Sequence, residues 1–185
     1  MLVRHGRTTA RNAGWLDSAG VAAWLDDYAH ASLANDDAPP ESLRVLAASA
    51  GIVVASDLPR ARASAERLVV ADAVVVSKLL RETPLLIPAL GALRLPFLGW
   101  GLAISAFDGL NRMRGTAPDT EVVNAGVVAA EWLVSLADSH RDVLAVTHVN
   151  VRTHIATALM QKGWSRVPGG SKWAPWSAWT FSRAN

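Results

Sequence analysis

The sequence predicts an α/β protein, a three-layer α/β/α sandwich built on a mostly parallel central sheet. Three observations support this prediction. Short, continuously apolar runs, typical of strands buried on both faces, recur along the chain. Segments with helical spacing of apolar residues separate these runs. Conspicuous polar residues follow directly where three of the runs end.

Apolar spacing and turn chemistry define the elements of the first half of the chain. A helix is expected where apolar residues recur at helical spacing, as at Val21, Trp24 and Tyr28. Strands are expected where the apolar run is continuous. Ser56 and Pro59 favour a helix start just after one such run. In order, we expect a strand at 2–3, a loop at 7–14, helices at 21–33 and 41–50, a strand at 52–55, a helix at about 58–69 and a β-like run at 73–76.

The second half of the chain continues the alternation of helices and strands. Val123, Val127 and Leu136 lie on or near one face of a predicted helix. We expect a helix at 120–137, a strand at 143–146, a helix at 149–160 and a final strand at 176–181. The sequence shows no internal repeat and no linker. We therefore expect a single domain over 1–185, with an apolar insertion or lid at about 83–118.

The composition is that of a folded protein with a substantial core. Of 185 residues, 51% are hydrophobic and 18% are charged, which excludes disorder along the whole chain. The net charge is only +2 and the basic residues are scattered, so we expect no nucleic-acid partner. The chain has no cysteine, which excludes a disulfide scaffold and a thiolate metal site. His30, His140 and His154 are interpreted as non-catalytic, and the histidine spacing is not that of a zinc site.

Localisation and membrane contact are judged from the apolar segments. No signal peptide is visible at the start, so we expect a cytoplasmic protein. The most apolar stretch, 83–107, is interrupted by three prolines and by Arg94. Between Arg94 and Asp108 lie 13 uncharged residues, fewer than the roughly 20 that a spanning helix needs. We expect no transmembrane span; a buried flap, a homodimer contact or a surface lying against lipid remain open.

Three predicted strands end in polar residues that together suit an anion. Arg4 and His5 follow the first strand, Ser56 and Arg60 follow the second, and His148 follows the last. Ligands of parallel sheets bind at the carboxyl ends of strands. If the three strands are neighbours, two histidines and two arginines converge on one pocket. Such a group fits phosphate, and a histidine with one free nitrogen can attack phosphorus.

The same three segments resemble a known family. The segment LVRHGRT at 2–8 resembles the LVRHGxT signature of the histidine phosphatase superfamily, the phosphoglycerate mutase-like proteins. The segment SDLPRARASA at 56–65 resembles the family's SxLxRAxxTA segment, and VTH at 146–148 resembles the strand end with its second histidine. The segments occur in family order and span most of the chain.

The resemblance implies a role for each matching residue. His5 would be the nucleophile that becomes phosphohistidine, and Arg4, Arg60 and His148 would bind the phosphoryl group. Glu82 is the matching candidate for the acid that protonates the leaving oxygen and later helps to activate water. No cofactor and no metal are implied.

Three positions near these motifs differ from the family pattern, and a fourth residue lies next to one of them. Arg7 stands where the family often has Glu, and Arg11 where it often has Asn, with Asn12 one residue further on. Val149 follows the second histidine where Gly is usual, and it could tighten the pocket floor. We expect these four residues to contact or shape the bound substrate.

The resulting prediction is a metal-independent phosphatase that hydrolyses a phosphate monoester through phosphohistidine on His5. Its partner would be a small phosphorylated substrate or inorganic phosphate. The compact length favours a phosphatase over a mutase. Two alternatives stay open: a weakly active or inactive anion-binding regulatory protein, and a protein phosphohistidine phosphatase. The Trp-rich tail is expected to pack in the core, or to form an aromatic wall or a dimer contact.

Overall fold

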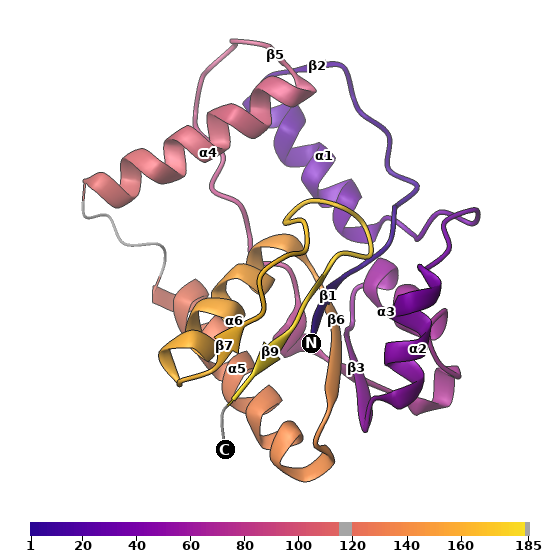
Figure 1. The fold of residues 1–185 in the computed structure, drawn as a ribbon. Coiled ribbons are helices and arrows are strands. Elements are labelled where there is room, and N and C mark those ends of the chain that lie inside the picture. The colour runs from indigo at the N-terminus through magenta and orange to yellow at the C-terminus, as the bar shows by residue number, and fades with distance from the viewer. Residues whose placement is uncertain (115–119, 184–185) are drawn as a thin grey trace.

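The computed structural model has a five-stranded sheet with helices on both faces (Figure 1). The structure describes residues 1–114 and 120–183. The strand order is β4-β3-β6-β1-β8. The first four of these strands are parallel, and β8 pairs antiparallel with β1. The strands are β1 (Leu2–Arg4), β3 (Ile52–Ser56), β4 (Val74–Ser77), β6 (Val143–Thr147) and β8 (Ala178–Trp179).

Helices and two small sheets complete the fold. The helices are α1 (Ser18–His30), α2 (Glu41–Ser49), α3 (Pro59–Glu66), α4 (Phe97–Met113), α5 (Thr120–His140) and α6 (Val149–Gln161), with short 3-10 helices η1 (Ala71–Ala73) and η2 (Lys78–Leu80). The small sheets pair β2 (Trp15–Leu16) with β5 (Leu95–Pro96), and β7 (Ser165–Arg166) with β9 (Phe181–Ser182). Figure 1 shows α1, α4, β2 and β5 together above the sheet.

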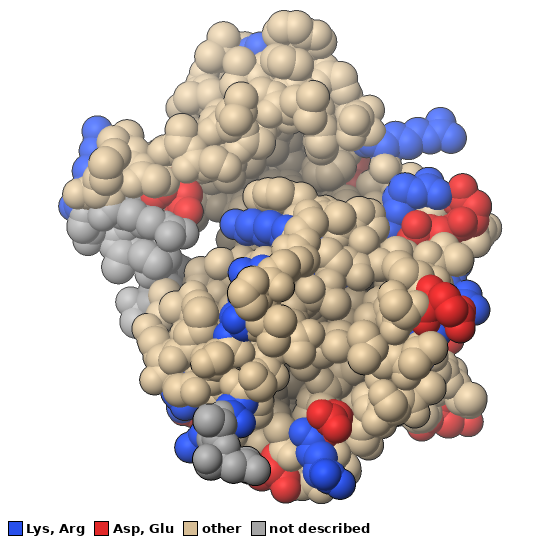
Figure 2. Space-filling model, in the orientation of Figure 1, with Lys and Arg blue, Asp and Glu red and all other residues tan. Residues whose placement is uncertain are grey.

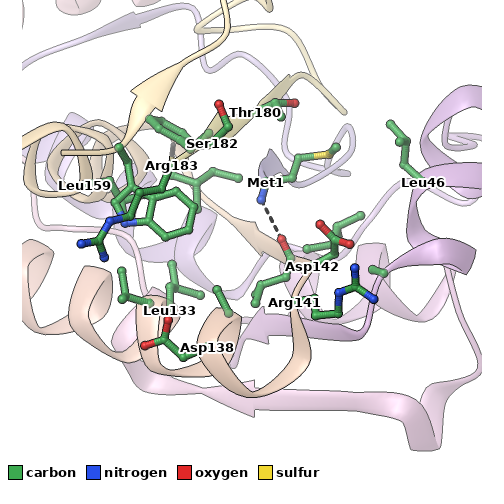
Figure 3. A pocket seen from close by; sticks show the side chains of 18 of the residues that line it. Met1, Leu46, Leu133, Asp138, Arg141, Asp142, Leu159, Thr180, Ser182 and Arg183 are labelled. Carbon is green, nitrogen blue, oxygen red and sulfur yellow. Dashed lines mark hydrogen bonds between the residues drawn. The ribbon is translucent and has the colours of Figure 1, made fainter. Parts of the chain in front are cut away.

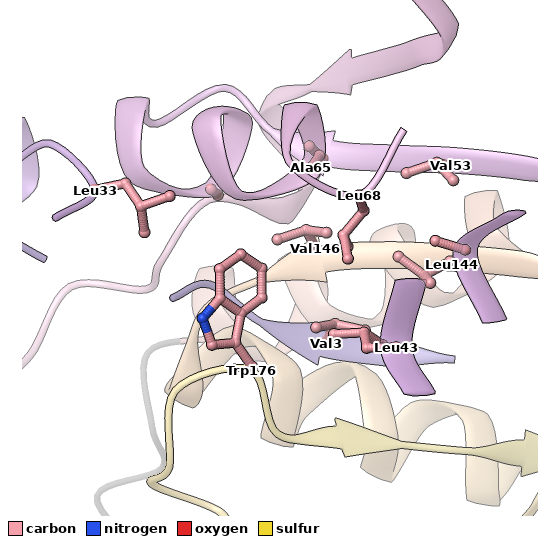
Figure 4. Packing of buried hydrophobic residues seen from close by; sticks show 12 residues of the cluster. Val3, Leu33, Leu43, Val53, Ala65, Leu68, Leu144, Val146 and Trp176 are labelled. Carbon is pink, nitrogen blue, oxygen red and sulfur yellow. The ribbon is translucent and has the colours of Figure 1, made fainter. Parts of the chain in front are cut away.

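The strands read as continuous apolar runs because both faces of the sheet are buried. Val3 and Val146 point into one core cluster with α2 and α3, and Trp176 from the C-terminal tail packs in it (Figure 4). Leu2 and Val54 point into a second cluster with α5 and α6. The predicted three-layer sandwich is therefore confirmed.

The last predicted strand is in fact two strands with different partners. Instead of one strand over 176–181, β8 pairs with β1 and β9 pairs with β7. Trp176 has a φ of 58°, a left-handed backbone conformation that no strand can contain. The residue turns the tail before β8 begins.

The helix boundaries differ from the expected ones for local reasons. The first helix begins at Ser18 because the Asp17 side chain accepts the N–H of Gly20, which makes Asp17 the N-cap. Helix α4 was not expected, because prolines and the unbroken apolar run obscured its periodicity. Pro96 directly precedes its first residue, Phe97, where proline stops a strand and favours a helix start.

The segment 83–118, where we expect a lid, contains β5 and α4, which lie above the sheet (Figure 1). Residues 115–118 lie outside the described residues. Trp100 is buried and its indole N–H donates to the carbonyl of Leu16 at 2.8 Å. Leu98 and Leu102, on the same helix, are 79% and 75% exposed. A homodimer through this segment stays a prediction.

One described helix is long and apolar enough to cross a membrane, over Val122–His140 of α5. Its residues Ala129, Ala130 and Leu133 are buried in the cluster shared with α6. Core helices of soluble proteins meet the same length and composition criteria. The absence of a transmembrane span stays a prediction.

Candidate active site

The predicted polar strand ends meet at one edge of the sheet. Strands β3, β6 and β1 are neighbours, so His5, Arg60 and His148 come together as the sequence indicated. All three side chains are buried. The rings of His5 and His148 lie 5.1 Å apart, centroid to centroid.

His5 has one unprotonated ring nitrogen in this cluster, which accepts a hydrogen bond from Arg60. Its Nδ1 lies 2.7 Å from the Gly6 carbonyl, and the Arg60 Nε–H donates to its Nε2 at 3.3 Å. A guanidinium only donates, so Nε2 accepts and Nδ1 carries the proton that is donated to Gly6. Burial lowers the pKa of His5 to about 3, with Arg60 and Arg4 adding to the effect. The ring is therefore neutral at neutral pH, and Nε2 is its unprotonated nitrogen.

Arg60 connects His5 to helix α1. Its Nη1 donates to the carbonyls of Tyr28 and Ala29, both at 2.9 Å, and its guanidinium lies over the Tyr28 ring at 4.5 Å. These carbonyls belong to the last turn of α1, whose carbonyls receive no N–H from a further helical turn; that of Tyr28 also accepts the Ala31 N–H at 3.2 Å. One buried arginine thus satisfies that helix end and orients His5.

His148 closes the other side of the cluster. It is the N-cap residue of α6, and its Nε2 lies 2.9 Å from the Ser56 hydroxyl. Its Nδ1 and the Nε of Arg4 are buried without a hydrogen-bond partner among the described residues. Burial, with His5 beside it, holds the pKa of His148 well below its ordinary value. Buried polar nitrogens without a partner, beside the start of a helix, fit an anionic ligand.

Glu82 lies at the start of α6, next to the second histidine. Its Oε1 accepts the backbone N–H groups of Thr83, Asn150 and Val151 at 3.0–3.1 Å. Burial raises the pKa of this carboxyl, while the three N–H groups oppose the rise. Glu82 caps the helix, and its role as the acid stays a prediction.

A cavity of about 260 Å³ opens above His5. Arg4, Arg7 and Asn12 line it, whereas Arg11 and Val149 do not. The lining residues are Arg4, His5, Gly6, Arg7, Thr8, Ala10, Asn12, Trp24, Tyr28, Phe97 and Pro175.

The predicted substrate contacts occupy different environments. The Arg7 guanidinium forms an exposed ion pair with Asp36 at 2.8 Å. Arg11 is exposed, and its carbonyl accepts the indole N–H of Trp24 at 2.9 Å. Val149 is buried in the first turn of α6. Arg11 and Val149 therefore shape the surroundings of the cavity rather than its wall.

A larger cavity, about 550 Å³, lies at the opposite edge of the sheet (Figure 3). Its walls include Met1 and Asp142, which precede β1 and β6. His5 lines the smaller cavity and not this one, whereas Arg60 and His148 line neither. Since catalytic groups of parallel sheets gather at the carboxyl ends of strands, the smaller cavity is the candidate active site.

The structure also resembles solved structures. A phosphoserine phosphatase from Entamoeba histolytica, in complex with 3-phosphoglyceric acid, matches with a TM-score of 0.54 at 15% identity, over 86% of this chain and 78% of that chain. A mycobacterial hydrolase matches with a TM-score of 0.52 at 19% identity, over 98% and 94%. This chain has the histidine phosphatase fold. Protein-family models and curated protein sequences give no match to the chain.

One buried arginine in this histidine phosphatase fold received no role from the sequence. Arg152 is fully buried one turn after His148, and its guanidinium lies 4.0 Å over the Trp179 ring. It donates to the carbonyls of Ser177 at 2.7 Å and Lys172 at 2.8 Å. Burial lowers its pKa to about 10. In the sequence, only the spacing of four residues from His148 could have placed Arg152 near the site. Its contacts with the tail could not be foreseen from the sequence.

Gly6 of the RHG segment lies where a side chain does not fit. A Cβ there would stand 2.6 Å from the Trp176 ring and would also meet Asp37. The Trp176 indole N–H donates to Asp37 at 2.7 Å, and the Gly6 N–H donates to Ser64 at 2.9 Å. The fold therefore brings the tail directly against the loop that carries His5.

Gly6→Ala is expected to lower the free energy of unfolding by about 1–3 kcal/mol, because the packed indole must move. Gly101→Ala on α4 is the control, since a Cβ there meets nothing within 4 Å; it should stabilise by about 0.5–1 kcal/mol. Urea unfolding of both variants measures the difference. Equal stability of the two variants would show that Trp176 does not pack against Gly6.

Acid is expected to destabilise the protein through its buried histidines. The folded-state pKa of His5 is depressed to about 3 from 6.5, so its stability contribution is complete above pH 6.5 and is lost as the pH falls toward 3. For His5 alone, the free energy of unfolding should fall by about 2 kcal/mol between pH 6.5 and pH 5. His148, whose pKa is also lowered, adds to this loss. Glu82, with a raised pKa, opposes the trend near pH 4.5 and above.

Urea unfolding from pH 7 to pH 5 tests this expectation, with His5→Asn as the comparison variant. Wild type should lose stability more steeply than the variant. Parallel pH profiles for the two proteins would contradict a buried, neutral His5.

Proposed function

We propose that this chain is a metal-independent phosphatase that hydrolyses a phosphate monoester through phosphohistidine on His5. The observation that carries the proposal is the neutral, buried His5, whose Nε2 lone pair lies beside the Arg60 guanidinium. The Nε of Arg4 and the Nδ1 of His148 are further buried nitrogens without a hydrogen-bond partner among the described residues. The solved structures with this fold include a phosphoserine phosphatase.

The chemistry follows in two steps. The Nε2 lone pair attacks phosphorus, the N–P bond forms, and the bond from phosphorus to the ester oxygen breaks. The leaving oxygen takes a proton, for which Glu82 is the proposed donor. Water then attacks phosphorus, the N–P bond breaks, the carboxylate takes the water proton, and inorganic phosphate leaves. Arg4 and Arg60 stabilise the charge on the transferring group.

Phosphate release from p-nitrophenyl phosphate between pH 4 and 8, with and without EDTA, tests the proposed metal-free reaction. Among the residues the structure describes, no group of three His, Cys, Asp or Glu side chains could hold a metal ion. We expect equal activity with and without the chelator. Loss of activity in EDTA, with recovery on adding a divalent metal ion, would contradict the proposal.

The position of Glu82 favours a second candidate, hydrolysis of phosphohistidine in proteins. Its Oε1 is occupied by three N–H groups of the backbone, and phosphohistidine carries a leaving group that does not depend on an added acid. An alkyl phosphate, in contrast, needs a proton donor. The two candidates therefore differ in what they require of Glu82.

Glu82→Gln separates these candidates, because glutamine can still accept the N–H groups of α6 but cannot donate a proton as an acid. For an alkyl phosphate such as phosphoserine we expect a fall in kcat of about 100-fold, and a much smaller fall for p-nitrophenyl phosphate. Glu82→Ala should also lose about 1 kcal/mol of stability with the cap. Full activity of Glu82→Gln on phosphoserine would make Glu82 a helix cap only.

A further inference from the structure

We propose that the preferred substrate is a small phosphate monoester of a flat, apolar alcohol, an aryl phosphate, and that Trp24, Tyr28 and Phe97 form the wall on which its ring packs. This inference rests on the proposed phosphatase function. It concerns the part of the cavity that the phosphoryl chemistry does not use. The three residues line the cavity above His5.

The three aromatic rings form one continuous cluster from two helices. Trp24 and Tyr28 of α1 stack at a centroid distance of 5.0 Å, and Phe97 of α4 meets the Trp24 ring edge-on at 4.6 Å. All three side chains are half-buried, so each keeps a surface outside the protein core. Offset and edge-on ring geometries are those in which aromatic groups attract one another.

The wall is held in place from outside the cluster. The Trp24 indole N–H donates to the Arg11 carbonyl at 2.9 Å, which fixes the plane of that ring. The Arg60 guanidinium lies 4.5 Å over the Tyr28 ring, and its Nε–H donates to the Nε2 of His5. The aromatic wall and the nucleophile are therefore positioned by the same arginine. A substrate ring against this cluster would therefore lie next to the phosphoryl site.

The charge distribution disfavours a second anionic group on the substrate. Arg4 and His5 lie at the phosphoryl end of the cavity, and no acidic residue is among its described lining residues. Arg7, the other charged residue in the lining, is paired with Asp36 at 2.8 Å. Figure 2 shows few charged side chains on the surface formed by α1, α4, β2 and β5. A second phosphate or a carboxylate thus meets no unpaired arginine or lysine beyond Arg4 in this lining.

The size of the cavity agrees with this substrate class. Its volume, about 260 Å³, lies just below the range of about 300–1,000 Å³ for small-molecule sites. A phosphoryl group and one aromatic ring suit a site of this size better than a phosphorylated sugar with several hydroxyl groups, because, apart from the His5, Trp24 and Tyr28 rings, Thr8 and Asn12 are the neutral polar side chains in the lining.

The test compares binding of phenylphosphonate and methylphosphonate by calorimetry, since neither is hydrolysed. We expect wild type to bind phenylphosphonate about tenfold more tightly. Trp24→Leu and Phe97→Leu should each lower the affinity for phenylphosphonate more than that for methylphosphonate, and so reduce this ratio. Trp173→Leu is the matched control, because Trp173 is 61% exposed and lies outside the cavity lining. Methylphosphonate binding reports whether each variant keeps the phosphoryl site.

Equal affinity for the two phosphonates in wild type would overturn the inference, as would an unchanged ratio in a folded Trp24→Leu variant. The companion measurement is turnover of phenyl phosphate against glycerol phosphate, with kcat/KM higher for the aryl ester. Efficient His5-dependent turnover of both esters with equal kcat/KM would keep the phosphatase and reject the aryl preference. Preferential phenylphosphonate binding with no turnover of either ester would support the aromatic wall and reject the phosphatase.

Discussion

His5→Ala is expected to reduce turnover of p-nitrophenyl phosphate by at least about 10³-fold, because it removes the ring whose unprotonated Nε2 is the proposed nucleophile. The Nδ1–H bond to Gly6 and the Arg60 contact both orient this one ring. His140→Ala is the matched control, since His140 is exposed at the end of α5 and is not among the cavity residues. Steady-state kinetics of both variants measure the effect.

Two results would contradict this prediction: activity that persists in the variant, or a wild-type protein without activity. Activity that persists in His5→Ala would point to another nucleophile. A wild-type protein without turnover that still binds inorganic phosphate would favour the anion-binding alternative over the phosphatase.

Arg60→Met is expected to have the second largest effect, on both stability and activity. The change leaves the carbonyls of Tyr28 and Ala29 without their buried charged donor, at a cost of about 3 kcal/mol. Loss of its Nε–H beside His5 should lower kcat by on the order of 10²–10³. Urea unfolding and phosphate release measure the two effects separately.

Arg62→Ala, on the same helix, is the control for Arg60→Met. Arg62 forms an exposed ion pair with Glu66 at 2.8 Å, and its loss should change stability by less than about 0.5 kcal/mol. Arg60→Lys adds a further comparison, because lysine keeps the charge but not the planar set of donors. Wild-type stability and activity of Arg60→Lys would contradict the role assigned to the guanidinium geometry.

The strand ends could be predicted because they depend on local sequence. A strand buried on both faces must be apolar, so the polar residues that follow it stand out. Arg4, His5, Arg60 and His148 were found in this way, and the adjacency of their strands is confirmed. The resemblance of three short segments to the histidine phosphatases supplied their proposed roles.

The aromatic wall and the tail contacts could not be predicted in the same way, because they join distant segments. Nothing in the helical spacing of Trp24 shows that Phe97, more than seventy residues later, meets its ring. The contacts of Arg152 also join distant segments, because its partners are the tail carbonyls of Lys172 and Ser177. A positive φ at Trp176 depends on that packing and leaves no signal in an apolar pattern.

The most direct test of the central claim is to trap the phosphorylated protein. A reaction with phenyl phosphate would be quenched in alkaline denaturant, which preserves phosphohistidine, and the phosphopeptide would be located by mass spectrometry. The account predicts phosphate on His5, absent from His5→Ala and unaffected in His140→Ala. Turnover with phosphate on another residue, or with no phosphorylated protein under conditions that trap a reference phosphohistidine, would contradict it.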